Sequence, residues 1–121
     1  MAFTNDSPIY VQIAEDIRTR ILSGDLTSGD QLMSTTQYAT TYRINPATAN
    51  KAFNDLVAEG IVYKRRGIGM FVTDDAPDIL RERGRADYRD TVLGPAVKTG
   101  ITLGMTPEAI HQLIDDIVED K

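Results

Sequence analysis

The chain has no cysteine, only one histidine and no long apolar run. Without cysteine, a disulfide framework, a zinc finger and a cysteine nucleophile are all excluded, and a reducing compartment is compatible with the sequence. No stretch approaches the roughly 18 apolar residues that span a bilayer, and the N-terminus lacks the basic and apolar regions of a signal peptide. These absences predict a soluble, cytoplasmic protein with no membrane partner.

Side chains suited to catalysis are equally scarce. His111 is the only histidine, and the neighbouring Asp115 and Asp116 point in different directions on a helix, so they cannot form a facing carboxylate pair. Glu108, His111 and Asp115 share a helical face, but exposed acidic helices often produce that spacing by chance. Gly67-Ile68-Gly69 is not followed by a helix, which excludes a dinucleotide-binding turn. We therefore expect no enzyme, no cofactor and no metal site.

The net charge of −5 argues at first against nucleic acid, because DNA affinity depends on basic side chains. The charges are unevenly distributed, however. Residues 31–72 hold five basic and two acidic side chains, a local charge of +3, whereas residues 77–121 carry a local charge of −3. A basic surface on an acidic chain can attract a phosphate backbone, because the local field governs approach and docking.

Residues 34–60 carry the signals of two consecutive helices joined by a short turn. Ser34 is placed to cap a helix of about two turns, and the turn follows at Arg43-Ile44. Asn45 caps the next helix with Pro46 in its first turn, and Gly60 ends it. The apolar residues of this helix, which share one face, are Ala49, Ala52, Phe53, Leu56 and Val57. We expect that face to pack in the core, which leaves a small, polar face outside.

A basic hairpin follows these helices. Residues 61–64 and 70–73 are rich in β-branched and aromatic side chains, and Arg65-Arg66-Gly67-Ile68-Gly69 separates them. Adjacent arginines at a glycine-rich tip suit a phosphate backbone or a minor groove better than they suit packing. A helix, a turn, a second helix and a basic hairpin, in this order, predict a winged helix-turn-helix DNA-binding domain, mainly α with a small β-hairpin.

The residues before this region predict one supporting helix. Ser7 is expected to cap it with Pro8 in the first helical position, and Gly24 ends it. Its apolar residues recur at the spacing of one buried stripe: Ile9, Tyr10, Ile13, Ala14, Ile17, Ile21 and Leu22. An extended piece at residues 31–33 is expected to pair with the hairpin. Residues 1–75 then form the DNA-binding domain.

Residues 76–121 predict a tail of two helices. Gly94-Pro95 interrupts the first helix, where a kink is expected, and Thr106-Pro107-Glu108 starts the second. The apolar side chains that need a partner are Leu80, Leu93, Val97, Ile110, Leu113, Ile114 and Ile117. That partner is either the winged domain or the same segment of a second chain. We favour a homodimer, because helix-turn-helix dimers read two half-sites and need a symmetric link.

The expected partner is a double-stranded DNA operator, a near-palindrome with half-sites about one helical turn apart. The helix after Asn45 would enter the major groove, and the arginines of the hairpin would hold the backbone. The residues expected to contact DNA are Ser34, Thr36, Arg43, Asn45, Ala47, Thr48, Asn50, Lys51, Arg65, Arg66 and Gly67. The alternative is a winged-helix module that binds protein instead of DNA, which the net charge of −5 would suit.

Several short motifs, in order along residues 8–72, resemble the GntR superfamily of bacterial transcriptional regulators. They are Pro8–Ile13, Gly24–Leu26, Ser28–Leu32, Asn45-Pro46-x-Thr48, Leu56–Ile61 and Arg65–Val72. The short tail resembles the YtrA-type branch, which implies dimerisation through that tail, no large effector domain, and repression, often of ABC-type transporter genes. The motifs identify no small-molecule effector.

Two positions depart from the pattern of that family. Where its members have Leu-Pro-Ser-x-Arg, this chain has Leu32-Met33-Ser34-Thr35-Thr36, so a neutral Thr36 replaces an arginine that contacts DNA in the family. Lys51 is also the only long basic side chain on the helix after Asn45. More of the DNA affinity is therefore expected to come from Arg65-Arg66 and from the presence of two copies.

Overall fold

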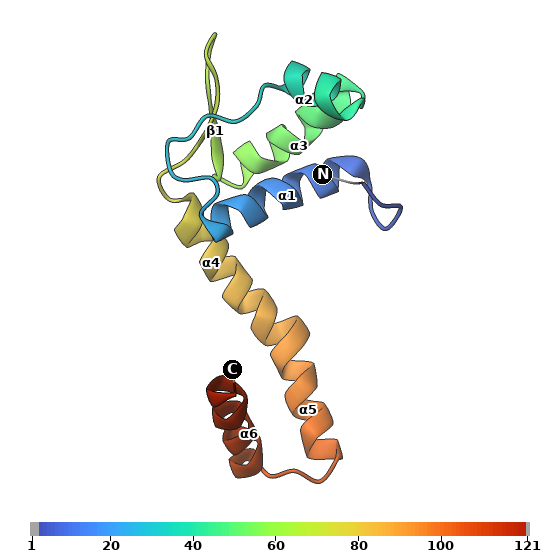
Figure 1. Ribbon diagram of the computed structural model, residues 1–121, viewed down its shortest axis with the longest axis vertical. Helices are drawn as coiled ribbons and strands as arrows, with labels where there is room; N and C mark the ends of the chain where they lie inside the picture. Colours follow the sequence, from blue (N-terminus) through green and yellow to red (C-terminus); the bar gives the residue numbers. More distant parts are fainter. Residues whose placement is uncertain (1–2, 121) are drawn as a thin grey trace. The chain divides into compact units, whose positions relative to one another are not determined.

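The computed structural model describes residues 3–120, which form two compact units that divide between Glu82 and Arg83 (Figure 1). The elements are α1 (Ile9–Ser23), α2 (Thr35–Tyr42), α3 (Pro46–Ala58), β1 (Val62–Arg65), β2 (Gly69–Val72), α4 (Ala76–Asp87), the π-helix η1 (Tyr88–Leu93), α5 (Gly94–Thr102) and α6 (Pro107–Glu119). The expected fold class, mainly helical with one antiparallel hairpin, is confirmed.

The helix ends follow the sequence signals closely, with one exception. The Ser34 side chain accepts a hydrogen bond from the Gln37 backbone N–H, while the Gln37 side chain accepts one from the Ser34 N–H, forming a reciprocal capping box. Asn45 caps α3 by accepting from the Ala47 N–H. The predicted cap by Ser7 is wrong, because α1 begins at Ile9, one residue later than expected, and the N-cap position falls on Pro8, which has no capping side chain.

The core of the first unit lies where α1, α2 and α3 meet the hairpin, and α1 runs alongside α3 (Figure 1). Its largest fully buried side chains are Phe53, Ile13, Leu56, Ile61, Val62 and Val72. Val57 was expected on the core face of α3 but is 40% exposed, and Leu22 of α1 is 49% exposed. Both residues lie at the edge of the apolar stripe of their helix, so the periodicity of the sequence predicted more burial than the structure shows.

The hairpin pairs Val62 with Val72 and Arg65 with Gly69, and a third segment extends it. Gln31 forms an isolated bridge with Phe71, and the Leu32 N–H donates to the Met70 carbonyl at 2.8 Å. The expected pairing of residues 31–33 with the wing is confirmed. This third segment ties β2 to the loop that enters α2.

The second unit contains η1, α5 and α6. A π-helical segment ends directly before Gly94, where an interruption was expected, and the helix continues as α5; the kink expected there stays a prediction. The Gly94 N–H donates to the Arg89 carbonyl, five residues earlier, and a Cβ at residue 94 would lie 2.9 Å from that oxygen. Pro95 has no N–H to donate, so the helical hydrogen-bond pattern is interrupted directly after Gly94. No helix in residues 3–120 has the length and hydropathy needed to cross a membrane.

Candidate DNA-binding surface

The outer face of α3 carries small polar side chains and one positive charge. Ala47, Asn50 and Lys51 are exposed, and Thr48 is half-buried. Its opposite face is held in the core by Ala49, Ala52, Phe53 and Leu56. Because the outward side chains other than Lys51 are short, a flat polar partner can approach this helix closely.

Two contacts fix α3 against α1. The Arg18 guanidinium donates to both carboxylate oxygens of Glu59, at 2.9 and 2.8 Å, and the Lys51 ammonium lies 4.5 Å from the centre of the Tyr10 ring. Burial lowers the pKa of Arg18, but its hydrogen bond to Glu59 and the charges of Glu59 and Glu15 outweigh that effect, so the pKa is raised and the side chain stays charged. The ion pair and the cation–π contact add to the core packing that holds α3 against α1.

Aromatic packing positions α2. Tyr38 is buried edge-on against Phe53 of α3, with ring centres 5.8 Å apart, and it also lies against Tyr42. Burial, with a smaller contribution from the charge of Asp16, raises the pKa of Tyr38 to about 12, so its phenol remains neutral. The start of α2 is thereby held beside α3.

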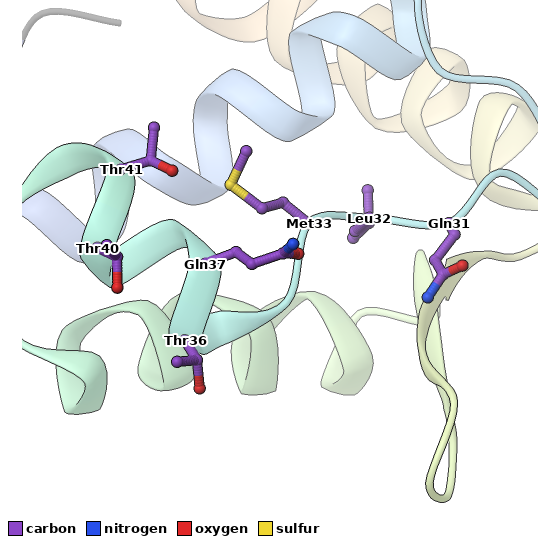
Figure 2. A pocket seen from close by; sticks show the side chains of 7 residues that line it. All are labelled: Gln31, Leu32, Met33, Thr36, Gln37, Thr40 and Thr41. Carbon is purple, nitrogen blue, oxygen red and sulfur yellow. The ribbon is translucent and has the colours of Figure 1, made fainter.

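A groove of about 670 Å³ runs between α2 and the segment before it (Figure 2). Its lining is neutral and mostly hydroxyl or amide: Gln31, Leu32, Met33, Thr36, Gln37, Thr40 and Thr41. Thr36 lies at the start of α2, and Gln31 lies beside the hairpin (Figure 2). The polar side chains of the groove can donate hydrogen bonds to phosphate oxygens, but none of them carries a charge.

The wing presents both arginines to solvent. The Arg65 guanidinium lies 5.5 Å from the centre of the Phe71 ring, and Tyr63 stacks on the same ring. The Ile68 N–H donates to the Arg65 carbonyl at 2.9 Å and closes the turn, in which Gly67 has a φ of 77°. Arg66 and Gly67 are exposed at the tip.

Arg43 links α2 to α3 in a conformation that side chains rarely adopt. Its φ of 54° makes it the one non-glycine residue among 3–120 in the left-handed region, where it ends α2. Its side chain is exposed. Such a conformation costs a residue with a Cβ about 1–2 kcal/mol.

We therefore expect the free energy of unfolding of Arg43→Gly to be about 0.5–1 kcal/mol higher than that of Arg43→Ala. Glycine relieves the backbone strain, but its greater conformational entropy in the unfolded chain offsets part of this stabilisation. Urea titration of the two variants measures the difference. Both variants remove the same guanidinium, so both should lose DNA affinity equally. A glycine variant less stable than the alanine variant would contradict the strain argument.

The structure brings the residues expected to contact DNA into the first unit, on α2, α3 and the wing. Ser34 and Asn45 are engaged as helix caps, so their oxygens are occupied, while the Ser34 hydroxyl and the Asn45 amide can still donate. Two residues were missed by sequence reasoning: Tyr10, which holds Lys51, and Gln31, which contacts the wing. Neither contact has a local signal, because the partners are far apart in the chain.

The residues expected at the dimer surface do not all lie in the second unit. Leu80 is only 5% exposed and packs in the core of the first unit, so it is removed from the expected dimer surface. Its helix begins in that unit, and its first apolar residues are used there. Leu93, Leu113, Ile114 and Ile117 are exposed, and Val97 and Ile110 are half-buried.

A recognition-type helix capped by Asn45-Pro46, a preceding short helix and a basic, glycine-tipped wing define a winged helix-turn-helix protein of the DNA-binding class. Residues 9–72 match the family described as bacterial regulatory proteins, gntR family, and the chain belongs to this family. It is a DNA-binding transcriptional regulator and not an enzyme.

Related proteins support this assignment over the whole chain. The HTH-type transcriptional repressor YtrA of Bacillus subtilis is 31% identical over 116 residues, which cover 96% of this chain and 88% of YtrA. A crystal structure of a transcriptional regulator from Oenococcus oeni has a TM-score of 0.82 and 28% identity, covering 98% of this chain and 97% of that one. AraR(DBD) in complex with operator ORX1 has a TM-score of 0.55 and 26% identity, covering 60% of this chain and 93% of that one.

Proposed function

We propose that the protein is a homodimeric transcriptional repressor of the YtrA type that binds a near-palindromic operator. The observation that carries this proposal is the basic wing: Arg65 and Arg66 are exposed beside a neutral groove and a small, polar α3 face. Repression is supported by the similarity to YtrA, which is named as a repressor. The cytoplasm is the compartment in which such a regulator acts.

The three parts of the surface have different roles in DNA binding. The outer face of α3 reads the major groove, with Thr48, Asn50 and Lys51 reaching base edges or flanking phosphates. Ser34 and Thr36 at the start of α2 donate neutral hydrogen bonds to the backbone. The wing supplies the charge that Thr36 lacks. A protein that contacts DNA in this way draws its specificity from α3 and much of its affinity from the wing.

The second unit supports the homodimer, because by itself it has almost no core. Gly100 is its one buried residue among residues 83–120. Gly100 of α5 lies against Ile110 of α6. A Cβ at residue 100 would be 3.2 Å from the Ile110 side chain, so the absence of a side chain there lets the two helices meet. Meanwhile Leu113 and Ile114 of α6 are 44% and 45% exposed, and Ile117 is 70% exposed. An amphipathic helix with its apolar face exposed needs a partner, and a second copy supplies a self-complementary one.

Selection of bound duplexes from a random DNA pool tests the proposed function. The expected result is a near-palindrome whose half-sites lie about 10 base pairs apart, or a multiple of that spacing. Sedimentation of the free protein should give a dimer, and the selected duplex should bind one dimer. A pool without enrichment, or a monomer at micromolar concentration, would contradict the proposal. Genes of ABC-type transporters beside the coding gene would support the proposed targets.

The rival function, a winged-helix module that binds protein, is favoured by two observations. The resemblance to the GntR pattern implies an arginine at the position of Thr36, and the chain has a net charge of −5. A wing that contacts only protein has no need of Arg65 and Arg66. Retention of the protein on heparin at low salt separates the two functions, since a protein-binding wing would flow through.

A further inference from the structure

The wing is held by a side chain from outside the hairpin. Gln31 lies in the segment that extends the sheet, opposite Phe71. Its Nε2 donates to the Ile68 carbonyl at 3.0 Å, across 37 residues of chain. Ile68 in turn donates its N–H to Arg65, so the Gln31 amide attaches to the turn that carries both arginines.

Gly69 makes this contact possible. A Cβ at residue 69 would lie 2.7 Å from the Gln31 Nε2, closer than real Cβ atoms come to another heavy atom. The φ of Gly69 is 145°, which a residue with a Cβ rarely adopts. Both the space and the backbone conformation therefore suit glycine, and the Gln31 side chain lies over it.

The hairpin alone gives the tip little support. An isolated two-stranded hairpin is marginally stable in water, and here the third segment reaches only as far as Phe71 and Met70. Closer to the tip, Arg65 and Gly69 are the last paired residues of β1 and β2. The Gln31 amide is the next attachment toward the tip, and Gln31 also lines the groove that contains Thr36 (Figure 2).

We infer that Gln31 is a positioning residue for DNA binding: its amide sets the place of the wing tip, and so of Arg65 and Arg66, relative to the groove beside α2. This inference rests on the proposed function, because it names a residue that acts through the wing. A wing tip restrained before binding loses less conformational freedom when it meets the backbone. Removing the amide should weaken DNA binding without removing any charge.

Gln31→Met tests the inference, because methionine has a similar length and cannot donate. Fluorescence anisotropy with duplex DNA of random sequence should show affinity about 3- to 10-fold lower, the range expected for one hydrogen bond. Gly69→Ala should lower affinity in the same way, because it displaces the Gln31 amide. Gln112→Met is the matched control: it makes the same change on α6, outside the proposed DNA surface, where the Gln112 amide donates to Asp116 and not to the wing.

A double-mutant cycle separates positioning from direct contact. If Gln31 acts through the wing, Gln31→Met should have no further effect in an Arg65→Ala/Arg66→Ala background. Additive losses would overturn the inference, because they would mean that Gln31 contacts DNA itself or supports the whole domain.

A measurement without DNA keeps this test independent of the proposed function. In the free protein, the ¹⁵N heteronuclear NOE of the Gly67 and Ile68 amides should fall in Gln31→Met, while that of Val72 should not change. Unchanged tip dynamics would overturn the inference even in a protein that binds DNA normally. Failure of the unaltered protein to bind any DNA would overturn the proposed function, and the NOE would still decide the role of Gln31.

Discussion

We expect Ile114→Glu to convert the proposed homodimer to a monomer and to lower operator affinity by about 100-fold or more. The residue is 45% exposed on the apolar face of α6. In a dimer that face is buried, and an unpaired charge there costs several kcal/mol. Loss of the dimer also removes the gain from binding two half-sites with one molecule, which commonly reaches about 10²–10⁴.

Sedimentation equilibrium and a mobility-shift titration of the selected operator measure these two losses. Gln112→Glu is the matched control, since it adds the same charge to the same helix on the polar side, next to Asp115 and Asp116. It should stay dimeric and bind normally. A dimeric Ile114→Glu protein would place the dimer surface elsewhere, and a monomer with full affinity would contradict the two-half-site arrangement.

Arg65→Ala/Arg66→Ala will weaken binding to every DNA sequence, by about 100-fold or more near 0.1 M salt, because charged hydrogen bonds to phosphate carry much of the affinity. In the proposed homodimer this change removes four arginines. Each phosphate contact contributes about −0.9 to the slope of log K against log salt, so the slope should become shallower by about 3–4. The preferred sequence should not change, since the residues proposed to read bases lie on α3.

Anisotropy titrations across salt, with selected and random duplexes, measure both effects. The matched control is Arg81→Ala/Arg85→Ala, which removes the same charge from α4, outside the proposed DNA surface. That variant should bind nearly normally with an unchanged slope. If both pairs weakened binding equally, net charge rather than the wing would account for the affinity.

The local signals of the sequence predicted most of the first unit. Ser34 with Gln37 and Asn45 with Pro46 specify helix starts through hydrogen bonds within a few residues, so their roles can be recognised without a structure. Gly60 and Gly67 have φ values of 80° and 77°, as expected for residues that end a helix and form a turn. The wing followed from adjacent arginines between two β-rich runs.

What could not be predicted depends on contacts between distant residues. Val57 and Leu80 both belong to apolar stripes, and only the packed structure shows that one is exposed and the other buried in the first unit. The hydrogen bond from Gln31 to the Ile68 carbonyl joins residues 37 apart in the chain, and no sequence spacing predicts it. The π-helix before Gly94 was foreseen only as an interruption, because proline predicts a missing hydrogen bond and not the turn that replaces it.

The contact between Lys51 and Tyr10 has a consequence for the thermodynamics of binding. A lysine free in solvent samples many rotamers, and fixing such a side chain at an interface costs about 0.5–1.5 kcal/mol. Here the ammonium already lies 4.5 Å from the centre of an aromatic ring, so part of that ordering occurs in the free protein. If Lys51 contacts DNA as proposed, Tyr10 makes the entropy of DNA association less unfavourable, although it lies on α1 and not on the proposed recognition helix.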